Sequence, residues 1–403
     1  MTELSYIERQ PPKIKMPRSV FNNLDELAEA LEQSKGWAGS HVFNSDLSKL
    51  DLTCPRGKEL LSKISEYDNL TTWPSDLQEI MSERLEAGKN SGLGISSVHK
   101  RGYTGKGINI AIIDQALLLE HPEYQDNIRY YKEFGIKEGC EKLGRSYEHY
   151  PAQYHGPAVA SLAVGTNCGS APGSGLFFVA KYDFDHNEKK EAFLDPSNRL
   201  KAIRHLIELN RSLPEADKIR TVSCSWGSNT ESDFNERMNL FKELEETGCM
   251  IFGGFYNHYN PNRRWNYIGG SKIDMTSDAP DNLKPLFACR ENTLIVPQNQ
   301  RTFASYYGGY LYTEQSGSSW SFPYLAGIVA CGLQACPNYT KQKDWQDKLW
   351  QDLVDTALPT TNRQGRIIQP VAFIDRMEGY AKERPVNQPM TALFKRFKDK
   401  GRS

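Results

Sequence analysis

Three polar residues of this chain, Asp114, His155 and Ser319, have the types and positions that nucleophilic catalysis requires. Asp114 ends the apolar run GINIAIID, His155 precedes the small-residue run GPAVASLAVG, and Ser319 lies just before YLAGIVACGLQAC. A serine hydroxyl needs a neighbouring imidazole to accept its proton, and that imidazole needs a carboxylate to fix its tautomer and stabilise its charge. The three residues therefore predict a hydrolytic site with Ser319 as nucleophile, His155 as base and Asp114 as the orienting acid.

Each of these residues also has an ordinary structural interpretation. An aspartate at a strand end often caps a turn, a lone histidine before a helix often fills space, and a serine before a helix often caps it. The segment GSSWSFP at 317–323 contains three serines, so residue type alone does not say which one would react. Chemistry is favoured only if the surrounding elements bring the three side chains together.

From about residue 106 the sequence alternates between short apolar strands and helices. Runs of this length rich in apolar and β-branched residues are typical of strands buried on both faces, and their alternation with helices predicts an α/β fold with a mostly parallel sheet. Ligands of such sheets bind beyond the carboxyl ends of the strands, where Asp114 would lie. The predicted strands are 107–114, 175–182, 219–226 and 248–255, and the predicted helices are 156–165, 197–212, 231–248 and 343–356.

The two ends of the chain differ from this central part. Residues 1–90 are richer in polar and charged residues and predict a helical or mixed N-terminal region, with helices over 23–33, capped by Asn23, and over 74–89. We place the catalytic domain at 91–378 and a basic, solvated tail at 379–403.

Charge and composition exclude several classes of partner. With 49 basic and 50 acidic side chains, no overall field favours nucleic acid or an anionic membrane. The first twenty residues contain no apolar signal-peptide core and no window approaches 18 consecutive apolar residues, so we expect no membrane partner and a cytoplasmic protein. The eight cysteines include no CxxC pair, which favours reduced structural thiols, and we expect neither a metal ion nor a cofactor.

Several segments of the chain resemble the sequence motifs of a known family, and they occur in the same order. The order Asp, His, Ser is that of subtilisin, and over residues 95–376 the chain resembles the subtilase family of serine proteases. HGPAVASLAVG resembles the family's HGTHVAG segment, and SGSSWSFPYLAG resembles its GTSMASPHVAG segment. The second alignment identifies Ser319 as the nucleophile rather than Ser318 or Ser321, through the anchors Gly317, Pro323, Ala326 and Gly327.

The resemblance implies a three-layer subtilisin-like fold and further site residues. Asn257 would take the oxyanion role, although its turn-rich surroundings also fit a plain polar turn. A peptide substrate would lie along Ser225, Trp226 and Gly227, with Trp226 equally acceptable as a core aromatic. The first specificity pocket would be lined by Gly254, Phe255 and Tyr256; because the family usually has small residues there, the two rings predict a shallow or gated pocket.

The implied function is a serine endopeptidase that cleaves peptides or proteins through an acyl-enzyme. The alternative is a catalytically impaired subtilase-fold protein that binds or regulates. In secreted relatives a segment like 1–90 is an inhibitory chaperone removed by self-cleavage, so residues 1–90 could act as an intramolecular inhibitor or stay as a regulatory region. Glu123 occupies the position of an acidic calcium ligand but lacks most of its companions, so we expect no tightly bound calcium there.

Overall fold

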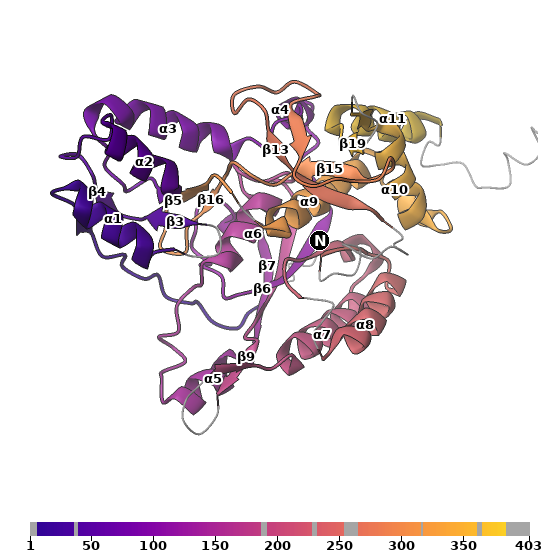
Figure 1. Cartoon of the computed structure of the whole chain (residues 1–403). Helices are drawn as coiled ribbons and strands as arrows, with labels where there is room; N and C mark the ends of the chain where they lie inside the picture. Colours follow the sequence, from indigo (N-terminus) through magenta and orange to yellow (C-terminus); the bar gives the residue numbers. More distant parts are fainter. Residues whose placement is uncertain are drawn as a thin grey trace, which may run out of the picture.

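The structure is a computed structural model of the 403-residue chain (Figure 1). It describes residues 6–35, 39–186, 192–227, 232–253, 265–315, 317–360 and 365–383. Within these ranges no helix has the length and apolar character needed to cross a membrane.

The centre of the molecule is a six-stranded parallel sheet. Its strands run in the order β1-β7-β8-β6-β11-β12, and every neighbouring pair is parallel. The four strands predicted from apolar runs are confirmed as β6 (Asn109–Asp114), β8 (Gly175–Lys181), β11 (Ile219–Cys224) and β12 (Met250–Gly253). The two strands on the β8 side were not predicted: β1 (Tyr6–Ile7) and β7 (Ile128–Phe134).

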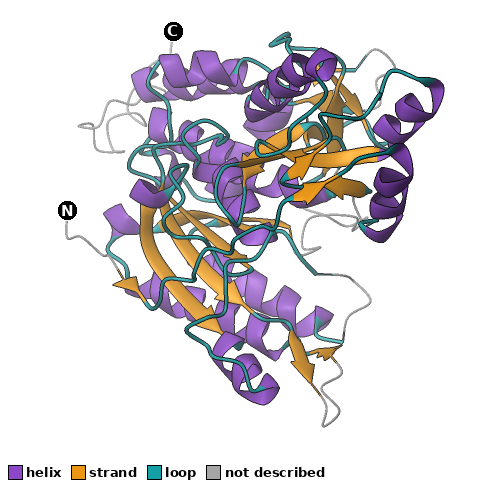
Figure 2. Cartoon of the chain, turned by 90° about the vertical axis from the view of Figure 1, so that its left-hand side faces the viewer, coloured by secondary structure: helices purple, strands orange, loops and turns teal. Residues whose placement is uncertain are grey.

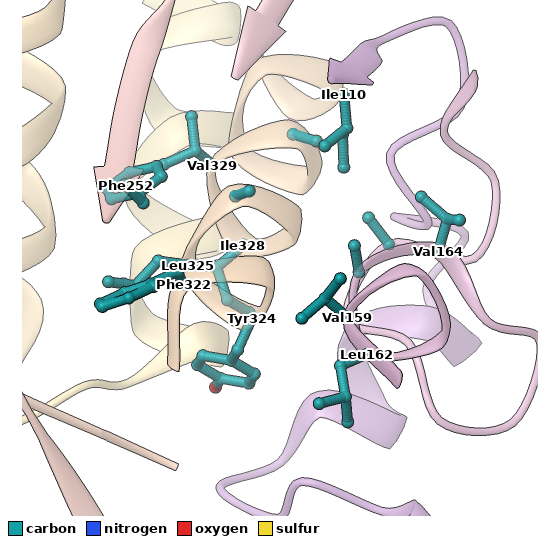
Figure 3. Close-up of a cluster of buried hydrophobic side chains, with 14 of the residues drawn as sticks. Ile110, Val159, Leu162, Val164, Phe252, Phe322, Tyr324, Leu325, Ile328 and Val329 are labelled. Atoms are coloured by element: carbon teal, nitrogen blue, oxygen red, sulfur yellow. The ribbon is translucent and has the colours of Figure 1, made fainter. Parts of the chain in front are cut away.

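Helices cover both faces of this sheet, so the predicted three-layer α/β arrangement is confirmed (Figure 2). Successive residues of β6 alternate between two cores: Ile110 and Ile112 pack with α6 (His155–Val164) and α9 (Ser321–Ala335). Ala111 and Ile113 pack on the other face with α7 (Ser197–Ser212) and α8 (Phe234–Glu246). Figure 3 shows the first core, in which side chains of α6 and α9 meet Ile110 and Phe252 of the sheet.

Two smaller sheets lie beside the central one. A five-stranded sheet has the order β14-β13-β15-β19-β18, with bounds Leu283–Pro285, Tyr267–Lys272, Leu294–Pro297, Arg366–Ile367 and Leu358–Pro359. A four-stranded sheet has the order β16-β17-β5-β3, with bounds Arg301–Ala304, Tyr310–Thr313, Ile64–Asp68 and Ser40–Val42. Two-stranded pairs are formed by β2 (Ser19–Val20) with β4 (Ser45–Asp46) and by β9 (Phe184–His186) with β10 (Ala192–Leu194).

The N-terminal region is mixed, as predicted, and it shares a sheet with the rest of the chain. Both predicted helices are present, as α1 (Leu24–Gln33), whose cap Asn23 accepts the backbone N–H of Asp25 and Glu26, and as α3 (Ser75–Lys89). A third helix, α2 (Pro55–Lys63), packs with them in a separate core. Strand β5 of this region pairs antiparallel with β17, so the boundary we placed at residue 90 is bridged by hydrogen bonds.

The remaining elements are α4 (Ile95–Lys100), α5 (Ile136–Leu143), α10 (Trp345–Thr356), which was predicted, and α11 (Pro370–Glu383). Because α11 continues to Glu383, the boundary placed at 378 falls inside this helix, and residues 384–403 lie outside the described ranges. Short 3₁₀ turns occur at η1 (Gln125–Asn127), η2 (Glu215–Asp217), η3 (Ser318–Trp320) and η4 (Tyr339–Lys341). All eight cysteines are free thiols.

Candidate active site

Asp114 is the last residue of β6 and is almost completely buried, with 2% of its surface exposed. Strands β6, β11 and β12 are neighbours and parallel, so their carboxyl ends meet at one edge of the sheet. That edge brings together Asp114, Ser225, which follows β11, and Gly253, which ends β12. This edge is where ligands of such sheets are expected to bind.

His155 is the first residue of α6 and contacts Asp114 directly. Its Nδ1 lies 2.7 Å from Asp114 Oδ1, and that oxygen also accepts the Gln115 N–H at 2.8 Å. The His155 backbone N–H donates to Gln115 Oε1 at 3.1 Å. In the tautomer whose Nδ1–H donates to the carboxylate, Nε2 carries a lone pair and can accept a proton. The structure thus brings these two predicted residues into contact, and their catalytic roles stay a prediction.

The close approach of α6 to the end of β6 depends on Gly156. A Cβ at this position would lie 2.3 Å from Gln115 O and 2.9 Å from Ala116 O, both of them backbone atoms. No larger residue fits without moving the helix, and moving the helix would move His155. The glycine that follows the histidine therefore has a steric reason to be there.

Ser319 lies in η3, directly before the buried helix α9. Its Oγ donates to Ser225 O at 3.3 Å, and Ser225 Oγ donates in return to Ser319 O at 2.8 Å. The ring of the next residue, Trp320, stacks on the His155 imidazole with centroids 5.1 Å apart. Ser321, by contrast, is buried and its hydroxyl faces Pro297 O at 3.5 Å. Of these two serines, only Ser319 is joined to the strand end beside Asp114.

In this arrangement the Ser319 hydroxyl is turned toward Ser225, and it must rotate about its Cα–Cβ bond to donate to His155. Such a rotation between staggered positions is an ordinary side-chain motion, because serine has a single short rotor. Proton transfer from Ser319 to His155 therefore requires that the hydroxyl first give up its bond to Ser225 O.

Trp226 faces the helices rather than standing free at the strand end. Its Nε1 donates to Ile113 O at 2.5 Å, and its half-buried ring packs 6.2 Å from the Phe241 ring. The Lys181 ammonium lies 4.6 Å from the ring centroid, a cation–π geometry. Gly227 follows with φ of +97°, a conformation that favours glycine. The Trp226 ring thus packs as a core aromatic. A role for this strand in binding substrate stays a prediction.

Four predicted residues, Gly254, Phe255, Tyr256 and Asn257, lie outside the described ranges. Gly253, the residue before them, has φ of +102° and sits against β11, where an added Cβ would lie 2.1 Å from Cys224 O. Gly253, the last residue before the predicted oxyanion and pocket segment, thus lies opposite Cys224, the residue before Ser225.

Glu123, at the position of the expected acidic calcium ligand, is buried and satisfied by protein donors. Its carboxylate accepts the Asn167 N–H at 3.0 Å, the Asn167 side-chain amide at 2.7 Å, the Cys168 N–H at 3.2 Å and the Tyr310 hydroxyl at 2.6 Å. Within the described ranges no cluster of three or more His, Cys, Asp and Glu side chains is arranged to hold a metal ion. The absence of a tight calcium site stays a prediction.

Two contributors to the site were not predicted. The Gln115 backbone N–H donates to Asp114, and the Gln115 side chain accepts the backbone N–H of His155. The Trp320 ring packs on the His155 imidazole. A sequence signal existed for both, since each is the bulky neighbour of a candidate catalytic residue.

One part of the chain matches a known protein family. Residues 105–253, which contain Asp114 and His155, match the model of the subtilase family, so the chain carries a subtilase-family region with a subtilisin-like α/β fold. Ser319 lies outside the matched residues, and its assignment depends on the motif around it.

Solved structures similar to this chain include a prenylagaramide maturation protease, PagA, with 15% identity and a TM-score of 0.47, covering 71% of this chain and 99% of that one. The A-subunit of the AB5 toxin from E. coli has 13% identity and a TM-score of 0.49, with 71% and 98% covered. A chain from the subtilase cytotoxin SubAB assembly has 13% identity and a TM-score of 0.49, with 72% and 96% covered.

Proposed function

We propose that this chain is a serine endopeptidase that hydrolyses peptide bonds through Asp114, His155 and Ser319. The observation that carries the proposal is the 2.7 Å contact between His155 Nδ1 and the buried Asp114 carboxylate. A buried carboxylate is costly unless it has a partner, and a histidine held against it has one nitrogen left to accept a proton. The stacking of Trp320 on His155 supports the assignment, because it keeps the imidazole beside the turn that carries Ser319.

In the first half of the reaction, Ser319 Oγ leaves Ser225 O, gives its proton to His155 Nε2 and forms a bond to the substrate carbonyl carbon. The carbonyl electron pair moves onto the oxygen, which becomes negative. Backbone N–H groups at the N-terminus of the 15-residue helix α9 favour negative charge there. The Asn257 amide is expected to add a second donor.

In the second half, His155 gives the proton to the amine, the C–N bond breaks, and a serine ester remains. Water then loses a proton to His155 and attacks the ester, which frees the carboxylic acid and returns the proton to Ser319. Asp114 stays ionised throughout, orienting the imidazole and stabilising the imidazolium.

The substrate in this proposal is an extended peptide or protein segment bound along Ser225–Gly227. Main-chain pairing to a strand gives affinity with little demand on sequence, and pockets then select side chains. Phe255 and Tyr256 would restrict the first pocket, so we expect a small residue before the cleaved bond. We propose that the protein has no nucleic-acid partner, since its basic and acidic side chains nearly balance. We also propose a cytoplasmic location.

One observation favours the second candidate, a subtilase-fold protein that binds or regulates without cutting. The Ser319 hydroxyl donates to Ser225 O instead of to His155. If that bond persisted when a peptide was bound, no base would reach the hydroxyl.

A fluorophosphonate probe separates the two candidates, because it labels a serine only when the serine is activated. We expect wild type to be labelled, Ser319→Ala to be unlabelled, and Ser321→Ala to be labelled like wild type, since Ser321 is buried against Pro297. Folded wild type that takes no more label than Ser319→Ala would overturn the protease proposal and leave the second candidate.

A further inference from the structure

The segment that leads into His155 is anchored at each of its last four residues. Gln153 N–H donates to Ala116 O at 2.9 Å, and His155 N–H donates to the Gln115 side chain at 3.1 Å. These two anchors come from the loop that follows Asp114.

The other two anchors come from the N-terminal region. The Ala152 N–H donates to Pro12 O at 3.3 Å, and the Tyr154 hydroxyl donates to Glu66 Oε1 at 2.7 Å. Tyr154 is the residue directly before His155. Two of the four residues in this segment are therefore anchored by residues numbered below 90.

The Glu66 bond fixes a ring that belongs to an aromatic cluster around His155. The Tyr154 ring meets Phe303 edge-on at 5.8 Å, Phe303 packs 4.8 Å from Trp320, and Trp320 stacks on His155 at 5.1 Å. Through this cluster and through the peptide bond from Tyr154 to His155, the position of the Tyr154 ring is coupled to that of the imidazole. Glu66 itself is 7% exposed, and burial raises the pKa of its carboxyl above the ordinary value.

Glu66 is held in place by pairing with the main part of the chain. It lies opposite Thr313 in the antiparallel pair of β5 and β17. Two residues along β5, the buried Asp68 accepts the hydroxyl of Tyr307 at 2.6 Å. Removal of β5 would expose the edge of β17 and free both Tyr154 and Tyr307.

We propose that residues 6–90 remain part of the working enzyme and that Glu66 is a positioning residue, which holds His155 through Tyr154. The inference rests on the proposed protease function. It differs from the expectation of a removable inhibitor, because here the N-terminal region supplies contacts that the catalytic histidine uses.

Substitutions at Glu66 test the positioning role. Glu66→Leu removes the acceptor of the Tyr154 hydroxyl, and we expect kcat to fall about tenfold while KM stays within twofold, because orientation of a general base affects the transition state. Glu66→Gln keeps an acceptor oxygen and should recover most of kcat. Glu79→Leu, at an exposed position of α3, is the matched control and should behave like wild type.

Two checks keep this test decisive. If Glu66→Leu does not fold, Tyr154→Phe removes the same hydrogen bond and should give the same separation of kcat from KM. Equal kcat values for Glu66→Leu or Tyr154→Phe and for Glu79→Leu would overturn the positioning role.

A second readout does not depend on turnover. The proton between His155 Nδ1 and Asp114 gives a downfield NMR signal, which should shift or broaden in Glu66→Leu and not in Glu79→Leu. If wild type proves unreactive, the proposed protease function fails, and this signal alone decides the positioning role: an unchanged signal overturns it.

The intact mass of the protein labelled by the fluorophosphonate tests retention. We expect the labelled species to contain residues 6–90. A labelled species that begins near residue 91, with no labelled longer form, would overturn retention while leaving the protease function standing.

Discussion

The Asp114 carboxylate is buried at the end of a strand, and a buried carboxylate is costly unless it is paired with a hydrogen-bond donor. One of its oxygens serves both His155 Nδ1 and the Gln115 N–H, at 2.7 and 2.8 Å. The Gln115 N–H donates to this oxygen, and so does the Nδ1–H of His155 in the tautomer protonated there. This arrangement selects the histidine tautomer that leaves Nε2 free to act as base.

Replacing Asp114 with Asn should lower kcat by about 10⁴, because an amide at this position can favour the wrong tautomer of His155. The rate of fluorophosphonate labelling, together with kcat on a cleaved peptide, measures the effect. The matched control is Asp126→Asn, at an exposed position in η1. A loss of less than tenfold in Asp114→Asn would show that His155 does not depend on this carboxylate.

At the residue scale, the sequence predicted the pair of Asp114 and His155 because each is next to an apolar element. It could not predict that Ser319 would bond to Ser225, since the two serines are 94 positions apart and only the fold brings them together. The contact of Trp320 with His155 was hidden for the same reason.

At the scale of elements, the position of α6 is set by backbone contact with the end of β6. Gly156 has no side chain, so the start of α6 can lie directly against the backbone of Gln115 and Ala116. The two segments are about 40 residues apart in the sequence. The register of His155 relative to Asp114 is therefore built into the packing of one helix on one strand.

Gly156→Ala should lower kcat by at least tenfold and destabilise the fold by about 1–3 kcal/mol, because the new methyl group would overlap two carbonyl oxygens. Thermal unfolding and kcat measure the two effects. Gly379→Ala is the control: this glycine is in α11 with no atom within 4 Å of the added Cβ, so stability should stay equal or rise by up to about 1 kcal/mol. Equal behaviour of the two variants would contradict the packing argument.

Whether an element could be predicted depended on how its side chains are buried. Strands such as β6 and β8 are apolar on both faces and were found from local pattern. Strands β7 and β5, with the sequences IRYYKEF and ISEYD, contain the buried acids Glu133 and Glu66. Their partners, Arg9 and Tyr154, are 124 and 88 positions away, so no local pattern distinguishes these strands from exposed ones.

At the scale of the whole molecule, the N-terminal region is joined to the central sheet by a buried ion pair. Arg9 binds Glu133 through two nitrogens at 3.1 and 2.8 Å, and both side chains are at most 4% exposed. Breaking a buried pair by removing one partner costs about 3–5 kcal/mol, since the other charge is left without compensation. Loss of the first residues would therefore weaken the central sheet as well as the N-terminal region.

A second junction joins the N-terminal region to the five-stranded sheet through Lys272. This lysine ends β13, is 4% exposed, and donates to Ala87 O at 3.3 Å and to Asn90 O at 2.5 Å at the C-terminal end of α3. Burial, together with the positive charge of Arg301, lowers the pKa of Lys272 to about 7, against the opposing effect of Asp278 and Asp274.

Because of Lys272, the free energy of unfolding should depend on pH in the neutral to alkaline range. Between pH 7 and about pH 10.5, the ordinary range of lysine, the unfolded chain holds the proton and the folded chain has released it. The unfolded state then binds more protons, so the free energy of unfolding should rise with pH across this window, by at most about 1.4 kcal/mol per pH unit. Below pH 7 both states are protonated and this contribution no longer changes.

Denaturant unfolding of wild type and Lys272→Met at several pH values between 7 and 10 measures this contribution. Other groups titrate in the same range, so the informative quantity is the difference between the two proteins, which should become more favourable to wild type as pH rises. Met has a similar length and no charge, which keeps the packing and removes the titration. A difference that stays constant with pH would mean that Lys272 keeps its proton in the folded protein, and that the carbonyl oxygens of α3 outweigh its burial.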